Sequence, residues 1–218
     1  MPRGGKTEIV KTSKNYYEND DWASPLVWGP PAWYLIHQIT KNLLKIDFKK
    51  MSSGESMTYQ EAIENFFYSL LKVIPCSICQ SHYQDLLVED SFYPYLDNWK
   101  KLDEWGFQLH NRVNKLLHKP IFTIAEYQKM YGGNKKIDYN HLVQFPDIVG
   151  NLYIEPGMSL SEIQDLKTFL NALVVLYPSR KSRTYQQIQK DKKNVKSIYD
   201  YKSLSDYYQT WIRLTQTY

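Results

Sequence analysis

Apolar residues at helical spacing recur along most of this 218-residue chain, and this pattern limits the folds that it can adopt. Several apolar runs follow a Ser or Thr that has an acidic residue three positions later, and such a pair caps the first turn of a helix. The pattern occurs at Thr58–Glu61, Thr123–Glu126, Ser159–Glu162 and Ser203–Asp206. The first 135 residues show no convincing strand pattern. The sequence therefore predicts an all-α fold.

Five helices are predicted in the first half. We expect the first to start at Pro30–Pro31, because proline fits the first turn of a helix, and to end near Leu44. A loop follows, from Lys45 to Met57. The remaining helices are expected at about residues 58–74, 76–88, 98–118 and 123–132.

The domain organisation follows from composition. Residues 1–21 are polar and expected to be flexible, residues 22–135 form the first domain, and residues 136–218 form a second, mostly helical domain. Residues 134–156 are interpreted as a linker. Residues 169–182 follow residues 66–79 at a shift of 103, so the second domain could be a degenerate copy of the first, with serines in place of the cysteines. The alternative is that any two apolar helices ending in proline look alike.

Composition and charge exclude several functions. No apolar run approaches the roughly 20 residues that span a bilayer, and the first 20 residues lack a secretory signal. The formal net charge of +4 implies no dedicated nucleic-acid surface. Two cysteines are too few for a secreted disulfide scaffold. We therefore expect no membrane span and no nucleic-acid partner, and a protein that stays in the compartment where it is made.

The two cysteines of the chain, Cys76 and Cys79, follow Pro75 at the start of a predicted helix. Their spacing allows a disulfide across one turn, and a helix N-terminus stabilises a thiolate there, which favours thiol–disulfide exchange. Two alternatives remain at this point. The pair could be inert, or it could bind zinc with histidines recruited from elsewhere, namely His82, His110 and His118.

Two further motifs are candidates for ligand binding. His110, Asn114 and Leu117 share one helical face, where they could hold a planar polar ligand between aromatic rings or form a solvated polar stripe. Trp33 and His37 lie one turn apart after Trp28-Gly29-Pro30-Pro31. Each of these two residues alone is more simply a core residue.

In this order and spacing, the three motifs resemble the Erv/ALR family of flavin-linked sulfhydryl oxidases over roughly residues 22–132, most closely members encoded by large and giant DNA viruses. The resemblance implies a four-helix bundle with a short fifth helix, usually a homodimer, with FAD in the mouth of the bundle. It implies that Cys76 and Cys79 are catalytic and that no metal is bound. It implies that FAD contacts Gly29, Pro30, Trp33, His37, Lys72, Cys79, His110, Asn111, Asn114, Leu117, Lys119 and Tyr131.

The resemblance also implies a reaction. Electrons would pass from a substrate dithiol to Cys76–Cys79, then to FAD and to O2, which leaves as H2O2. Because no cysteine remains for a shuttle disulfide, a thiol-containing protein would reach Cys76 directly or through a separate redox protein. We expect such an enzyme in the virion and/or the host cytoplasm. The alternative function is a non-enzymatic helical binding module with a structural or metal-binding cysteine pair.

Overall fold

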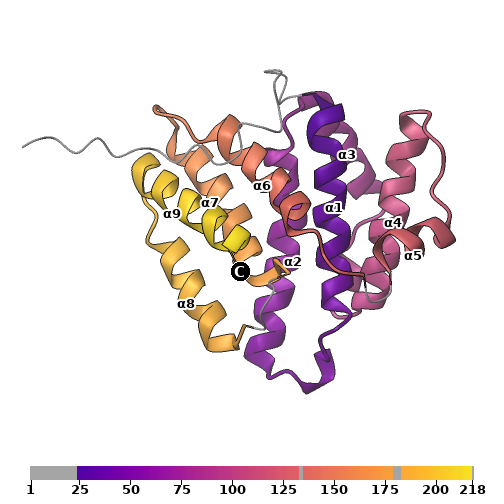
Figure 1. Cartoon of the computed structure of the whole chain (residues 1–218), viewed down its shortest axis with the longest axis horizontal. Helices are drawn as coiled ribbons and strands as arrows, with labels where there is room; N and C mark the ends of the chain where they lie inside the picture. Colours follow the sequence, from indigo (N-terminus) through magenta and orange to yellow (C-terminus); the bar gives the residue numbers. More distant parts are fainter. Residues whose placement is uncertain (1–23, 133–134, 179–182, 218) are drawn as a thin grey trace, which may run out of the picture.

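The computed structural model describes residues 24–132, 135–178 and 183–217, and their regular structure is entirely helical (Figure 1), which confirms the predicted fold class. The α-helices are α1 (Pro25–Leu43), α2 (Ser53–Val73), α3 (Ser77–Glu89), α4 (Trp99–Leu116), α5 (Ile124–Tyr131), α6 (Tyr139–Tyr153), α7 (Leu160–Leu176), α8 (Tyr185–Lys196) and α9 (Tyr201–Thr217). Two short 3₁₀ helices cover Phe48–Lys50 and Tyr93–Tyr95. Within the described ranges, no helix is long and apolar enough to cross a membrane.

Two of the four predicted capping pairs, Thr123–Glu126 and Ser159–Glu162, mark the true starts of helices. Thr123 and Ser159 cap α5 and α7, each accepting a hydrogen bond from the backbone N–H three residues later. Cys76 is the N-cap of α3, and Asn98 is the N-cap of α4. In these cases the local signal and the tertiary structure agree.

The starts of α1 and α2 were predicted too late. Ser24 caps α1 and Pro25 occupies its first turn, so Pro30 and Pro31 lie inside the helix. Ser52 and Glu55 form the capping box of α2, whereas Thr58 lies inside α2. The Thr58 hydroxyl donates to the carbonyl of Gly54 at 2.9 Å, as a helix-interior threonine often does.

The second half contains more helix than its composition indicated. The predicted linker is largely α6, whose apolar face is buried, and the lysine-containing segment Tyr185–Lys196 forms α8. The last helix begins at Tyr201 and not at Ser203, whose hydroxyl contacts Asp200 just before the helix. Burial against the first half stabilises these segments, and local composition does not reveal it.

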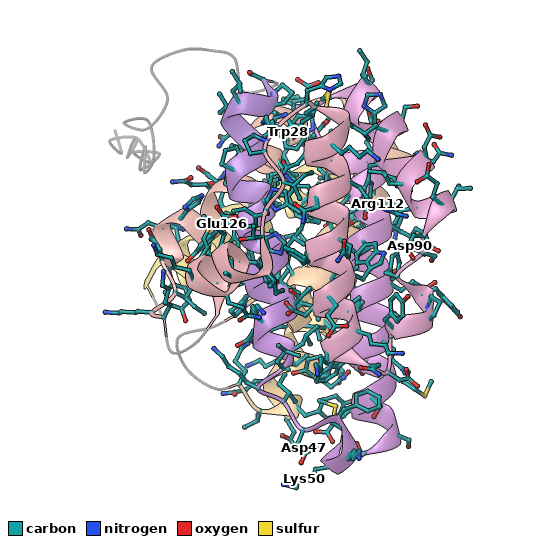
Figure 2. The ribbon with its side chains drawn as sticks, turned by 90° about the vertical axis from the view of Figure 1, so that its right-hand side faces the viewer. Trp28, Asp47, Lys50, Asp90, Arg112 and Glu126 are labelled. Carbon is teal, nitrogen blue, oxygen red and sulfur yellow. A yellow bond between two sulfur atoms is a disulfide. The ribbon has the colours of Figure 1, made fainter. Side chains whose placement is uncertain are left out.

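Helices α1 and α2 lie in the middle of the molecule, with α3–α5 on one side and α6–α9 on the other (Figure 1). One continuous hydrophobic core contains Leu35 and Phe66 from the first half and Phe145 and Phe169 from the second. At the outer side, Nη1 of Arg112 on α4 lies 3.5 Å from Oδ2 of Asp90 at the end of α3 (Figure 2). A domain boundary near residue 135 stays a prediction, but the two halves share their core.

Candidate active site

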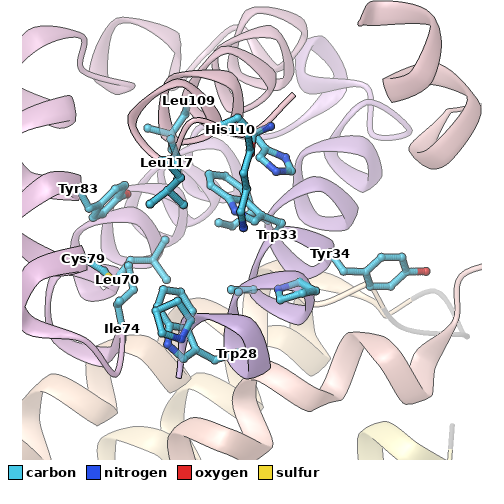
Figure 3. Close-up of a pocket in the computed structure, with 18 of the residues that line it drawn as sticks. Trp28, Trp33, Tyr34, Leu70, Ile74, Cys79, Tyr83, Leu109, His110 and Leu117 are labelled. Atoms are coloured by element: carbon cyan, nitrogen blue, oxygen red, sulfur yellow. The ribbon is translucent and has the colours of Figure 1, made fainter. Parts of the chain in front are cut away.

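A cavity of about 600 Å³ opens between α1, α3, α4 and α5, with α6 at its edge (Figure 3). Its volume is within the range of small-molecule and cofactor sites, and its wall is mainly apolar and aromatic. Nine of the predicted FAD-contacting residues line it: Gly29, Pro30, Trp33, Cys79, His110, Asn114, Leu117, Lys119 and Tyr131. The fold thus brings residues from four helices and from the loop after α4, far apart in the sequence, to one space.

The cysteine pair forms a disulfide at the first turn of α3. The backbone N–H of Cys79 donates to Sγ of Cys76 at 3.2 Å, so the helix N-terminus faces the Cys76 sulfur. Both residues are half-buried, but only Cys79 belongs to the cavity wall. The two sulfurs therefore have unequal surroundings: that of Cys79 faces the cavity, and that of Cys76 faces the free N–H groups of the helix.

A stack of flat side chains forms the wall opposite the disulfide. The rings of Trp33 and His110 are nearly parallel, with centroids 4.0 Å apart. Behind them, Nε2 of the fully buried His37 lies 2.9 Å from Nδ1 of His110. One of the two nitrogens must donate and the other accept, so the tautomers of His37 and His110 depend on each other.

Both histidines are neutral at physiological pH. Burial lowers the pKa of His110 to about 4, with a further contribution from the charge of Lys119. Burial also lowers the pKa of His37 well below its usual value, and the neighbouring His110 and Lys41 act in the same direction. The cavity wall therefore carries no charge at His110, and His110 can make a hydrogen bond as a neutral imidazole.

Three predicted FAD contacts lie outside the cavity wall, as does Cys76. His37 lies behind the cavity wall and is hydrogen-bonded to His110. Lys72 is exposed near the end of α2. The Asn111 side chain donates to the carbonyl of Phe122 and accepts from its N–H, both at 2.8 Å. Asn111 thus positions Phe122, which does line the cavity.

The cavity also contains residues that the sequence analysis did not assign to FAD. They are Pro25, Trp28, Ala32, Tyr34, Ile36, Leu70, Ile74, His82, Tyr83, Leu109, Val113, Leu116, Phe122, Met130 and His141. Helical spacing from Trp33 and His110 could have indicated several of the α1 and α4 residues.

His141 is the residue of the cavity wall that comes from the described part of the second half. It stacks on Tyr34, with ring centroids 4.4 Å apart and an interplanar angle of 12°. The hydroxyl of Tyr34 in turn accepts a hydrogen bond from the N–H of Asp138 at 2.9 Å. No local signal could have found His141, because the approach of α6 to α1 is a tertiary contact.

A buried polar cluster fixes α5 against α1 and α4 beside the cavity. Asp103 of α4 accepts hydrogen bonds from Thr40 at 2.9 Å and from the hydroxyl of Tyr127 at 2.6 Å. Its second oxygen lies 2.6 Å from Nζ of Lys41. Desolvation, together with the charge of Asp103, raises the pKa of Tyr127, so Tyr127 remains a hydrogen-bond donor. This cluster holds Tyr131 in place at the cavity wall.

The residues present fit FAD. Trp33 and His110 offer flat faces for a planar ring system, and Cys79 brings a sulfur to the same space. Lys119, in the loop after α4, offers a cation that suits a pyrophosphate. Within the described part of the chain, no group of three or more His, Cys, Asp and Glu side chains is placed to hold a metal ion.

Comparison with known proteins gives a consistent result. A model of the Erv1 / Alr family matches residues 30–132. The chain is 30% identical over 116 residues to an FAD-linked sulfhydryl oxidase of African swine fever virus (isolate Pig/Kenya/KEN-50/1950), covering 52% of this chain and 89% of that protein. It is 27% identical over 101 residues to the mitochondrial FAD-linked sulfhydryl oxidase erv1 of Schizosaccharomyces pombe, covering 46% of this chain and 51% of that protein. It is 25% identical over 96 residues to a putative FAD-linked sulfhydryl oxidase of Invertebrate iridescent virus 3, covering 44% of this chain and 60% of that protein.

No solved structure gives a significant match. The family match contains the cysteine pair, the His110 helix and most of the cavity wall. On the strength of this segment and of the viral relative that it covers almost completely, the chain belongs to the Erv1 / Alr family.

Proposed function

We propose that this protein is an FAD-linked sulfhydryl oxidase that forms disulfides in protein substrates. The observation that carries the proposal is the position of the Cys76–Cys79 disulfide, which opens α3 at the edge of an apolar, ring-lined cavity and turns only Cys79 toward it. The names of the relatives from African swine fever virus and from yeast support the activity and the cofactor.

Substrate oxidation uses the two sulfurs in order. A substrate thiolate attacks Sγ of Cys76, forms a mixed disulfide and releases Cys79 as a thiolate at the cavity wall. The second substrate thiolate attacks the substrate sulfur of the mixed disulfide, which completes the substrate disulfide and releases Cys76 as a thiolate. The N–H of Cys79, 3.2 Å from Sγ of Cys76, stabilises this leaving thiolate together with the helix N-terminus. The cysteine pair has then taken up two electrons.

The cavity residues would hold FAD next to Cys79. Trp33 and His110 would contact its flat rings, Asn114 would donate or accept a hydrogen bond, and Lys119 would pair with its phosphates. When bound, FAD would accept the two electrons of the cysteine pair and pass them to O2, which leaves as H2O2. The neutral His37–His110 pair adds no charge to the part of the wall that Trp33 and His110 form.

The substrate would be a protein dithiol that reaches Cys76 directly or through a separate redox protein, since this sequence contains no third cysteine. Several relatives come from large DNA viruses, which supports a place of action in the virion and/or the host cytoplasm. The homodimer that the family resemblance implies stays a prediction.

The proposal is tested with the purified chain and with Cys76→Ser, Cys79→Ser and, as a matched control between them, Ser77→Ala. We expect a yellow protein that consumes O2 with a dithiol, and a loss of about 100-fold or more in both cysteine variants but not in Ser77→Ala. With the oxidised, disulfide form of a substrate protein, the Cys76 thiolate of Cys79→Ser should attack that disulfide and form a mixed disulfide, releasing the other substrate sulfur as a thiolate. A colourless protein that binds no flavin would contradict the proposal and favour a helical binding module, and full activity in Cys79→Ser would contradict the electron path through Cys79.

A further inference from the structure

The two halves of the chain repeat one order of helix contacts. In the first half α1 packs on α4 and α2 on α3, and in the second half α6 packs on α9 and α7 on α8. Between the halves, α1 packs on α6 and α2 packs on α7 (Figure 1). Each central helix therefore meets its own counterpart. Contact between corresponding elements is the property of an isologous interface about a two-fold axis.

Single residues follow the same correspondence. Phe66 of α2 and Phe169 of α7 are equivalent at the shift of 103, and their rings face each other with centroids 6.2 Å apart and an interplanar angle of 21°. After α2 and α7, the capping residues Ile74 and Tyr177 have nearly the same backbone angles, φ −65° and ψ 120° against φ −61° and ψ 123°. A proline follows each of them. The counterparts of the cysteines, Ser179 and Ser182, lie outside the described residues.

In the second half, side chains fill the space between the counterpart helices. Tyr208 of α9 is buried and its hydroxyl donates to the carbonyl of Pro146 on α6. Its ring lies directly against Gly150, where a Cβ would come within 2.5 Å of the ring. The rings of Tyr177 and Trp211 meet edge to face, with centroids 5.1 Å apart. At these described positions, aromatic side chains fill the space between α6, α7 and α9.

The second half nevertheless contributes to the cavity of the first. His141 lies in the cavity wall and stacks on Tyr34, and the N–H of Asp138 holds the Tyr34 hydroxyl. Tyr34 also lies against Tyr131, with ring centroids 6.1 Å apart. Three aromatic side chains from α5, α1 and α6 thus form one edge of the cavity, and the edge is incomplete without the second half.

We propose that residues 136–218 are a degenerate copy of the first half that occupies, within a single chain, the place of a second subunit and completes the cofactor cavity with His141. The chain then works as a monomer with one redox centre, in place of a homodimer. The flavin count and the role of His141 rest on the proposed function, whereas the oligomeric state and the fold of the second half do not.

The first test measures the molar mass and the flavin content of the full chain. Light scattering after size exclusion, at several loading concentrations, should give one species close to the chain mass of 25.9 kDa. Flavin absorbance against protein concentration should give about one FAD per chain. A dimer that persists on dilution, or two flavins per chain, would overturn the proposal. A colourless monomer would contradict the oxidase function and leave the subunit argument intact.

The second test addresses His141. His141→Ala removes the ring that stacks on Tyr34, whereas His141→Phe keeps a flat ring there, and Gln144→Ala is a control on the same helix outside the cavity wall. We expect His141→Ala to release flavin on heating at a lower temperature than the parent, with the His141→Phe variant recovering most of the difference and Gln144→Ala unchanged. If His141→Ala keeps the parent release temperature while circular dichroism shows an unchanged helix content, the second half is not part of the site.

Discussion

At the scale of single residues, His110 makes several of the contacts that shape the cavity wall. Its ring stacks on Trp33 and is hydrogen-bonded to His37, and burial lowers its pKa so that it stays neutral. A charged imidazolium at this position would have no carboxylate partner, because the described cavity wall contains no Asp or Glu. Protonation of this pair therefore acts against the folded state.

We expect the free energy of unfolding to fall as the pH is lowered from about 6.5 to 4. An unfolded histidine has a pKa near 6.5, whereas His110 in the folded protein has a pKa of about 4. Within this window the unfolded chain binds more protons, so acid favours unfolding, by up to about 3 kcal/mol from His110. The lowered pKa of His37 acts in the same direction.

Denaturant titrations at several pH values check this prediction. His110→Gln should show a smaller loss of stability across the window, whereas the exposed His82→Gln should match the parent. An identical pH dependence in His110→Gln and in the parent would show that His110 does not contribute.

Elements are fixed to one another by a small number of buried contacts. Asp103 joins α1, α4 and α5 through Thr40, Lys41 and Tyr127. Because α5 has only eight residues, it has little stability of its own and depends on such contacts. The position of Tyr131 at the cavity therefore depends on a carboxylate one layer behind it.

Asp103→Asn should lower the free energy of unfolding by about 3 kcal/mol, because it leaves the partly buried Lys41 ammonium without its anion. It should also weaken flavin retention, since α5 is loosened. Thermal melts followed by circular dichroism and by flavin fluorescence measure both effects. The neighbouring Glu104 is exposed, so Glu104→Gln should stay within about 0.5 kcal/mol of the parent. Equal stability of both variants would refute the role given to Asp103.

The close packing of α6 on α9 gives a second prediction at the scale of helices. Gly150→Ala would place a methyl group 2.5 Å from the buried ring of Tyr208, and we expect a loss of about 1–3 kcal/mol. Gly106→Ala on α4 is the matched control, because the nearest atom to its Cβ would be 3.7 Å away. There the better helix propensity of alanine should stabilise by up to about 1 kcal/mol. Chemical denaturation of both variants would show opposite signs, and the same sign in both would contradict the packing argument.

The whole molecule is organised around α1 and α2, which are covered from both sides. The second half also reaches the N-terminal half of α2, where Nζ of Lys192 on α8 lies 2.8 Å from Oε2 of Glu61. The core residues Phe66 and Phe169 face each other across the halves and are fully buried. The two halves therefore stabilise each other.

A fragment that ends at residue 135 should not remain a folded monomer. Removal of α6–α9 would expose the faces of α1 and α2 that now contact α6 and α7, and an apolar surface of this kind drives association or aggregation. Size exclusion and circular dichroism of the fragment, with the full chain as control, check the expectation. A folded fragment that elutes as a monomer and retains flavin would show that the second half is dispensable.

The sequence by itself determined the features that depend only on residues close together in the chain. The starts of two helices were predicted correctly from the capping boxes at Thr123 and Ser159. The disulfide was predicted correctly from the spacing of the two cysteines after Pro75. Each of these features depends on atoms within one turn. The family resemblance placed nine residues of the cavity wall, and for five of them the reason is the same, because they lie at fixed spacing on α1 and α4.

Only the tertiary structure decided the rest. The polar segment after residue 134 is helical because α6 buries an apolar face on α1, and His141 enters the cavity through that same contact. Asn111, which the resemblance assigns to the cofactor, hydrogen-bonds the backbone of Phe122, since the fold brings the loop after α4 back to its side chain. Contacts between residues far apart in the chain depend on how helices pack, and no local spacing encodes that packing.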